Sequence, residues 1–179
     1  MADGFYNHGD LRRLAINLFN GWGYNFYRLE NQLRADDQLV RGKAAWLVGL
    51  AAAAVDAAEA DYRRTAIPPP TRAEPFPAPA AMAGAQAIER LSRAIGALVG
   101  RIHAQPVPEN DRMTQRYRQE AETLYTLADR DQQLVGQCDL LRSMVEGRGG
   151  AWVLANLPEL ETGVAAIEAT LRDRAGLLQ

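Results

Sequence analysis

The sequence predicts an all-α fold, an elongated and mostly antiparallel helical bundle, from three observations. Apolar residues recur at spacings of three and four through most of the 179 residues, which is the spacing of one helix face. No segment shows the alternation of β-branched residues that is typical of strands. Glycine and proline gather at a few sites and divide the chain into long pieces. We expect two long helices, at about 25–64 and 110–147, and three or more shorter ones.

The length favours a single domain, so we assign residues 1–179 to one helical bundle with a proline-rich connector at 67–79. The formal net charge is −2 and both signs are spread along the chain, which gives no overall field for nucleic acid or anionic lipid. Every basic residue except Lys43 is an arginine. Together with the high alanine content, this is typical of a GC-rich bacterial genome.

Neither terminal nor internal apolar segments predict a membrane protein. The first residues lack the basic segment followed by an apolar run that a secretory signal needs. The longest apolar run, at 44–55, is about half the length that spans a bilayer. We therefore expect a cytoplasmic protein without a membrane partner.

The segment LFNGWGYNFY at 18–27 raises the first question about a site. Two glycines inside a helix would each cost roughly 1 kcal/mol relative to alanine, whereas Asn20-Gly21 can end a first helix that begins near Asn7 or Asp10. We expect a turn filled by aromatic side chains, with a distorted continuous helix as the alternative. As candidate ligand- or partner-binding residues we take Phe19, Trp22, Tyr24 and Tyr27.

The first long helix is expected to continue through the sequence ADDQLV at 35–40. A similar stretch, ADRDQQLV at 128–135, lies in a strongly helical segment without glycine or proline, and each copy has an aspartate near the apolar seam. The alternative is a helix that ends at Arg34, followed by a new helix with Asp36 as its cap.

The connector at 67–79 has the sequence IPPPTRAEPFPAP, and its prolines remove backbone donors and favour extended conformations. We expect a crossover that can run the length of a helix. A proline-rich recognition motif is the functional alternative.

A helix at 80–104 follows, with one apolar stripe that consists of Ile88, Leu91, Ile95, Leu98 and Ile102. The sequence QPVPEN ends it. The second long helix then carries apolar residues close to a 3.5-residue repeat, from Met113 to Val145, and the glycines of GRGG end it with left-handed caps. A final helix at 157–174 is predicted by the Asn156/Glu159 capping box and by Pro158 in the first turn.

Charged residues on the second long helix mostly predict solvated ion pairs, such as Asp139 with Arg142. Asp131 is the exception because it lies nearest the apolar seam. A buried aspartate there needs an arginine or tyrosine partner, and it can fix the register of the helix at a cost in stability.

No motif predicts catalysis. Neither His8 nor His103 stands three residues after a glutamate, so the ligand pairs of di-iron bundles are missing, and there is no phosphate loop or nucleophile elbow. The lone Cys138 is expected to fill the core. We assign no catalytic residue, no metal ligand and no cofactor, and neighbouring acids lead us to expect no nucleic-acid binding by the basic pairs Arg12-Arg13 and Arg63-Arg64.

Small residues predict close helix packing. The sequence AWLVGLAAAAVDAA is rich in alanine, and Gly96 and Gly100 stand one turn apart. A helix whose apolar stripe outgrows its partners favours self-association, so we expect a homodimer. The sequence thus favours a non-catalytic adaptor or assembly factor that binds a protein partner or itself through an exposed helical face. The alternative is a small-molecule-binding or catalytic bundle with a pocket near residues 19–27.

Overall fold

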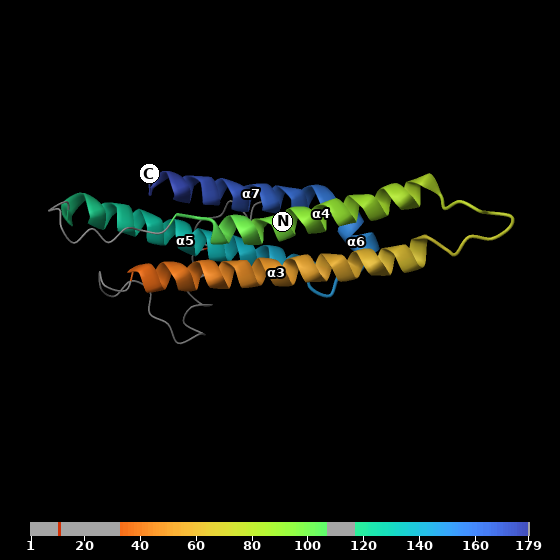
Figure 1. Ribbon diagram of the computed structural model, residues 1–179, viewed down its shortest axis with the longest axis horizontal. Coiled ribbons are helices and arrows are strands. Elements are labelled where there is room, and N and C mark those ends of the chain that lie inside the picture. The colour runs from red at the N-terminus through yellow and green to blue at the C-terminus, as the bar shows by residue number, and fades with distance from the viewer. Residues whose placement is uncertain (1–10, 12–32, 107–116, 179) are drawn as a thin grey trace.

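The computed structural model describes residue 11, residues 33–106 and residues 117–178. Regular structure in these ranges is entirely helical and comprises α3 (Leu33–Ala66), α4 (Pro79–His103), α5 (Tyr117–Val145), α6 (Gly150–Ala155) and α7 (Leu157–Gly176). Four of these helices lie along the long axis of the molecule, and the short α6 lies near one end (Figure 1). The predicted all-α, elongated helical bundle is confirmed.

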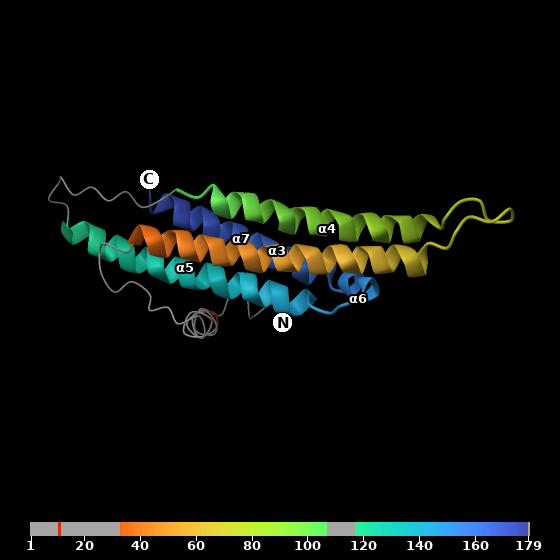
Figure 2. The ribbon, with the colours of Figure 1, turned by 60° about the horizontal axis from the view of Figure 1, so that its bottom comes forward.

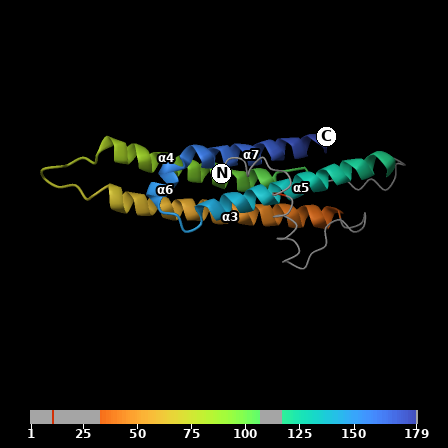
Figure 3. The ribbon, with the colours of Figure 1, turned by 180° about the vertical axis from the view of Figure 1, so that it is seen from behind.

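The four long elements form a square in cross-section. α3 and α5 run in one direction along the bundle, and α4 and α7 run in the other (Figures 1 and 2). Close packing joins α3 to α4 and α5, and it joins α7 to α4 and α5, so α3 and α7 face each other diagonally. α6 packs against α3 and α4 and leads the chain from α5 into α7, as the view from behind shows (Figure 3).

α3 is continuous through Asp36 and Asp37, so the alternative of a break after Arg34 is wrong. Asp36, the expected cap, therefore lies inside the helix and not at its start. The carboxylate of the next residue, Asp37, is buried and accepts hydrogen bonds from Arg41 one turn later, a pairing that needs both residues in one continuous helix. The predicted start of this helix, at 25–32, and the start of the second long helix, at 110–116, lie outside the described residues.

The core is aliphatic and runs along the whole bundle. The predicted stripe of α4 is buried from Ile88 to Ile102, and it meets buried alanines, valines and leucines of α3. Alanines 44, 45, 51 and 58 of the alanine-rich segment are part of this core, as expected. Cys138 is also buried within it, which confirms its packing role.

The connector between α3 and α4 differs from the prediction. It does not cross the bundle but projects beyond the ends of both helices as a loop (Figure 1). The reason is that α3 and α4 are antiparallel neighbours, so the end of one already lies beside the start of the other.

The second long helix ends close to its predicted position, at Val145, and Gly147 has the expected left-handed conformation with φ 68°. The short helix α6 was not predicted. Asn156 lies between the two helices, at the C-cap of α6 and the N-cap of α7, and its Nδ2 donates to the carbonyl of Trp152 at 2.8 Å. The predicted capping box is therefore wrong, although Pro158 does lie in the first turn of α7.

Close helix packing occurs at glycines other than those predicted. A Cβ atom added to Gly96 or Gly100 would meet nothing within 4 Å, so these two residues face open space. The tight contacts are at three other positions: Gly84 packs against Tyr62, Gly136 against the backbone of Leu11, and Gly150 against α3.

Candidate functional site

The candidate residues from the aromatic segment, namely Phe19, Trp22, Tyr24 and Tyr27, all lie outside the described residues. The same holds for the turn predicted at 20–24 and for His8. The hypothesis of a pocket near residues 19–27 therefore stays a prediction, and the sites described below come from the rest of the chain.

A cluster of buried charges joins three helices at one end of the bundle. It consists of Asp37 and Arg41 on α3, Asp131 on α5 and Arg174 on α7. The Arg174 guanidinium donates from Nε to Asp131 at 2.7 Å and from Nη2 to Asp37, and both partner side chains are fully buried. Arg41 donates to the other Asp37 oxygen, from Nη2 at 2.7 Å. The predicted buried aspartate with an arginine partner is confirmed at Asp131.

The two arginines also bind the carboxyl end of α4. Arg41 Nη1 donates to the carbonyl of His103 at 2.9 Å, and Arg174 Nη1 donates to the carbonyl of Pro106 at 3.2 Å. Carbonyl groups at a helix end have no partner within the helix and carry a partial negative charge. The cluster therefore ties α4 to the other three long helices.

Electrostatics keep Arg174 ionised. Burial lowers the pKa of Arg174, but the carboxylates of Asp131 and Asp37 more than offset this effect, so its pKa is raised. Because the cluster has no exposed functional group, it has nothing to offer a ligand in solution. We interpret it as a register device, which agrees with the role expected for Asp131.

Sequence reasoning identified Asp131 but missed its partner Arg174 and the other two members of the cluster, Asp37 and Arg41. The available signal was the apolar repeat itself. Arg174 takes the next position of the α7 stripe, after Leu160, Val164, Ile167 and Leu171, all of which are buried. A charged residue at such a position belongs to the seam, and an extension of the α7 stripe by one step would have found Arg174.

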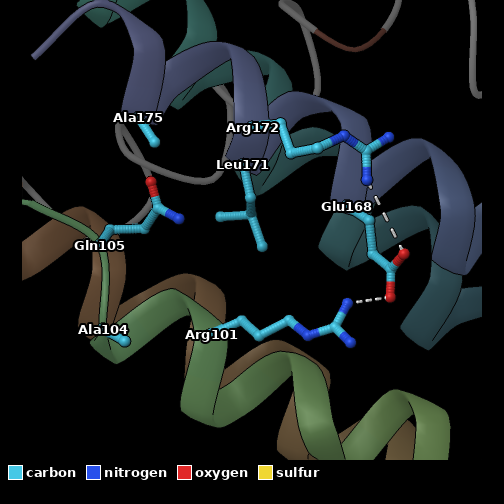
Figure 4. A pocket seen from close by; sticks show the side chains of 7 residues that line it. All are labelled: Arg101, Ala104, Gln105, Glu168, Leu171, Arg172 and Ala175. Atoms are coloured by element: carbon cyan, nitrogen blue, oxygen red, sulfur yellow. Dashed lines mark hydrogen bonds and ion pairs between the residues drawn. The ribbon is translucent and has the colours of Figure 1, made fainter. Parts of the chain in front are cut away.

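The described residues form a surface cavity of about 390 Å³ between the end of α4 and α7 (Figure 4). Arg101, Glu168 and Arg172 lie along one side of it, and Glu168 pairs with both arginines. Both guanidinium side chains are mostly exposed to solvent, which screens their charges. We therefore assign no ligand to this cavity.

α3 exposes apolar side chains on the side that faces away from the bundle. Trp46 is 53% exposed and Leu50 is 40% exposed, and Ala53 and Ala57 continue the same line at helical spacing. We call these four residues the α3 strip. Lys43 lies over the indole ring of Trp46, with Nζ 5.5 Å from the ring centroid.

Two glycines flank the α3 strip, and a Cβ atom added to Gly42 or Gly49 would meet nothing within 4 Å. Beside the large side chains of Trp46, Lys43 and Leu50, the strip thus has positions with small side chains or none. This combination of large groups and open small-residue surface is what a second helix needs to approach closely.

Basic residues of the described part mostly have acidic partners. Arg64 pairs with Asp61 at 2.7 Å, and Arg63 pairs with Glu59 and with Glu89. The predicted pair of Asp139 with Arg142 also forms, at 2.9 Å, but it is not solvated as expected, because Asp139 is buried. These pairs agree with the expectation that acids cancel the positive field locally. Arg12, Arg13 and the basic residues at 112 and 116 lie outside the described residues.

The described residues contain neither a candidate metal site nor a candidate membrane-spanning helix. No three histidine, cysteine, aspartate or glutamate side chains in this part of the chain are placed to hold one metal ion. Of the helices in the same ranges, none combines the length and the apolar character that crossing a membrane requires.

Comparisons of this chain with protein-family models, with curated proteins and with solved structures found no match.

Proposed function

We propose that this protein is a non-catalytic interaction protein that acts through the α3 strip, and that the first partner of this strip is a second copy of the chain. The observation that carries the proposal is the exposure of Trp46 and Leu50 on a helix whose opposite face is buried in the core. Exposed tryptophans supply much of the binding free energy at protein interfaces, and charged side chains are depleted there. The α3 strip itself contains no charged residue.

The order of side-chain sizes supports an antiparallel pair of α3 helices. If a two-fold axis passes between residues 49 and 50, Trp46 of one copy lies opposite Ala53 of the other, and Gly42 lies opposite Ala57. Trp46 of each copy then meets a small side chain, and Leu50 of one copy lies near Leu50 of the other. A two-fold interface must be complementary to itself, and this stretch of α3 satisfies that requirement.

The first test is the molar mass in solution. We expect the protein to be a dimer at tens of micromolar by light scattering, and we expect Trp46→Ala to weaken association by roughly 30-fold, equivalent to about 2 kcal/mol. The matched control is Phe76→Ala, which removes an exposed aromatic outside the α3 strip. A monomeric parent protein at these concentrations would contradict the proposal.

The second test addresses the orientation of the two copies. A cysteine at position 50 lies next to its counterpart in the antiparallel pair, whereas cysteines at position 57 are about 22 Å apart at 1.5 Å per residue. A short bismaleimide should therefore link Leu50→Cys dimers and leave Ala57→Cys dimers unlinked. Linkage at both positions would indicate a parallel pair, and the antiparallel register would be wrong. The buried Cys138 should not react in either variant.

A further inference from the structure

The connector between α3 and α4 is longer than the geometry of the bundle requires. Adjacent antiparallel helices are commonly joined by about 2–8 residues, but residues 67–78 form a loop that extends beyond both helix ends (Figures 1 and 3). Almost all of its side chains are exposed, and none belongs to the core. The extra length therefore contributes no buried apolar surface to the fold.

The loop nevertheless has a defined conformation, which its own hydrogen bonds support. The backbone N–H of Thr71 donates to the carbonyl of Glu74 at 3.0 Å, and the N–H of Glu74 donates to Oγ1 of Thr71 at 3.0 Å. These two bonds close a turn between two proline-rich arms, residues 67–70 and residues 75–78. Ala78, at the end of the second arm, has φ −57° and ψ 128°, close to polyproline II values.

Phe76 stands between Pro75 and Pro77 on the second arm and is 84% exposed. An isolated exposed aromatic residue on a flexible chain would need no explanation. Here proline fixes the backbone on both sides of the ring, so little conformational entropy remains to be lost when the ring is buried by a partner.

We propose that residues 67–78 are a docking segment for another protein, which holds the loop in a groove lined by aromatic side chains. The prolines lack the N–H groups that strand addition to a sheet edge needs, and the segment contains no helix that a helix-binding groove would accept. The binding mode that is left is recognition of the polyproline II conformation. In this mode proline rings pack on aromatic faces of the partner, and the free backbone carbonyls accept hydrogen bonds from tyrosine or tryptophan. Phe76 would fill an apolar pocket beside that groove.

This proposal extends the function proposed above to a second surface, and the two surfaces do not share residues. The α3 strip ends at Ala57, ten residues before the loop begins at Ile67. A variant of one surface should therefore leave the other intact, so failure of one proposal can be recognised without ambiguity.

The test uses the full chain with the photoreactive amino acid benzoylphenylalanine at position 76, expressed in the native host. After illumination, mass spectrometry identifies the linked peptide of the partner. We expect one dominant linked protein whose linked peptide lies beside a groove lined by tryptophan, tyrosine or phenylalanine. Links to a second copy of this chain, links to a surface without such a groove, or no links above the unilluminated control would each overturn the proposal.

Binding of the purified partner to the purified protein then gives the contribution of each group. Phe76→Ala should weaken binding at least tenfold, and the double change Pro69→Ala with Pro70→Ala should weaken it severalfold. Thermal unfolding should stay unchanged in Phe76→Ala, because this arm contributes nothing to the core. The double proline variant should unfold at a slightly lower temperature, because alanine gives the unfolded chain more conformational freedom than proline does. Trp46→Ala is the matched control and should bind the partner with unchanged affinity. Equal binding by the parent and Phe76→Ala would overturn the proposal.

Discussion

The two ends of the bundle are held together by opposite means. At one end, Arg174 and Arg41 pair with Asp37 and Asp131 in a buried cluster that joins α3, α5, α7 and the last carbonyls of α4. At the other end, Gly84 of α4 packs against the side chain of Tyr62, and Gly150 of α6 packs against Tyr62 and the backbone of α3. Directional hydrogen bonds fix one end, and steric fit fixes the other.

The comparison shows why a bundle of this composition needs both devices. The helix faces between the ends carry repeated alanine, leucine and valine, and a slip by one turn would replace such contacts with similar ones. Charged groups in the interior have partners at one position only, so they exclude a slipped arrangement. Glycines with no room for a methyl group exclude it at the other end.

The largest expected effect comes from removal of the central arginine. Arg174→Ala should reduce the free energy of unfolding by about 3–5 kcal/mol, because it leaves two buried carboxylates without their shared partner. Urea unfolding followed by circular dichroism measures this change. The matched variant Asp37→Leu/Arg41→Met/Asp131→Leu/Arg174→Met removes all four charges of the cluster and should recover most of the loss. If Arg174→Ala costs under 1 kcal/mol, the cluster does not stabilise this end.

The steric end should respond to a single methyl group. A Cβ at position 150 would lie 2.4 Å from the carbonyl oxygen of Ala58 and 2.4 Å from Cβ of Tyr62, so Gly150→Ala should cost about 1–3 kcal/mol. Gly96→Ala is the matched control in a helix interior with open space, and it should stabilise the protein by about 0.4–1 kcal/mol. Equal effects of the two variants in urea unfolding would show that steric fit at α6 is unimportant.

Burial of Cys138 in the aliphatic region between the ends should make the unfolding free energy depend on pH. Burial raises the pKa of the Cys138 thiol, with a smaller contribution from Asp139. The folded protein therefore keeps the thiol proton while the unfolded chain loses it above its ordinary pKa of about 8.5, so stability should fall as the pH rises. Between the parent and Cys138→Ala, the difference in unfolding free energy should shrink by about 1.4 kcal/mol from pH 7 to 9.5. A pH-independent difference would indicate an accessible thiol.

The smallest effect is expected for an ion pair at the steric end. Arg64 and Asp61 are 2.7 Å apart, as close as Arg174 and Asp131, but both side chains are largely exposed to solvent. Arg64→Ala should change the unfolding free energy by at most about 0.5 kcal/mol, since water and side-chain entropy offset the attraction. Thermal unfolding in low and high salt is the measurement. A loss comparable to that of Arg174→Ala would mean that burial does not set the difference between the two pairs.

The sequence predicted the elements better than their arrangement. The stripe of α4, the end of α5 near Gly147 and the position of Asp131 all follow from local periodicity and from residue chemistry, which a single chain displays. The direction of the 67–79 connector did not follow, because it depends on which helices become neighbours. The partner of Asp131 was missed for the same reason: Arg174 is 43 residues away, and Asp37, which binds the same guanidinium, is on a third helix.

The α3 strip could also be predicted only in part from the sequence. The alanine-rich segment of α3 predicts close packing, but one helix turn buries Leu47 while Trp46 beside it is exposed. Periodicity identifies a broadly apolar helix and does not say which side its neighbours cover. The exposed side of α3 is set by the positions of α4, α5 and α6, which pack around the rest of the helix.

The sequence separation between Asp37 and Arg174 has a consequence for folding during synthesis. The two residues are 137 positions apart, so at a synthesis rate of about 5–20 residues per second roughly 7–27 s pass between their additions to the chain. During that interval Asp37 can already form its ion pair with Arg41, one turn away on the same helix. α3 can thus form early with the charge of Asp37 already paired. When α7 is synthesised and packs against the bundle, Arg174 adds the second ion pair to the same carboxylate.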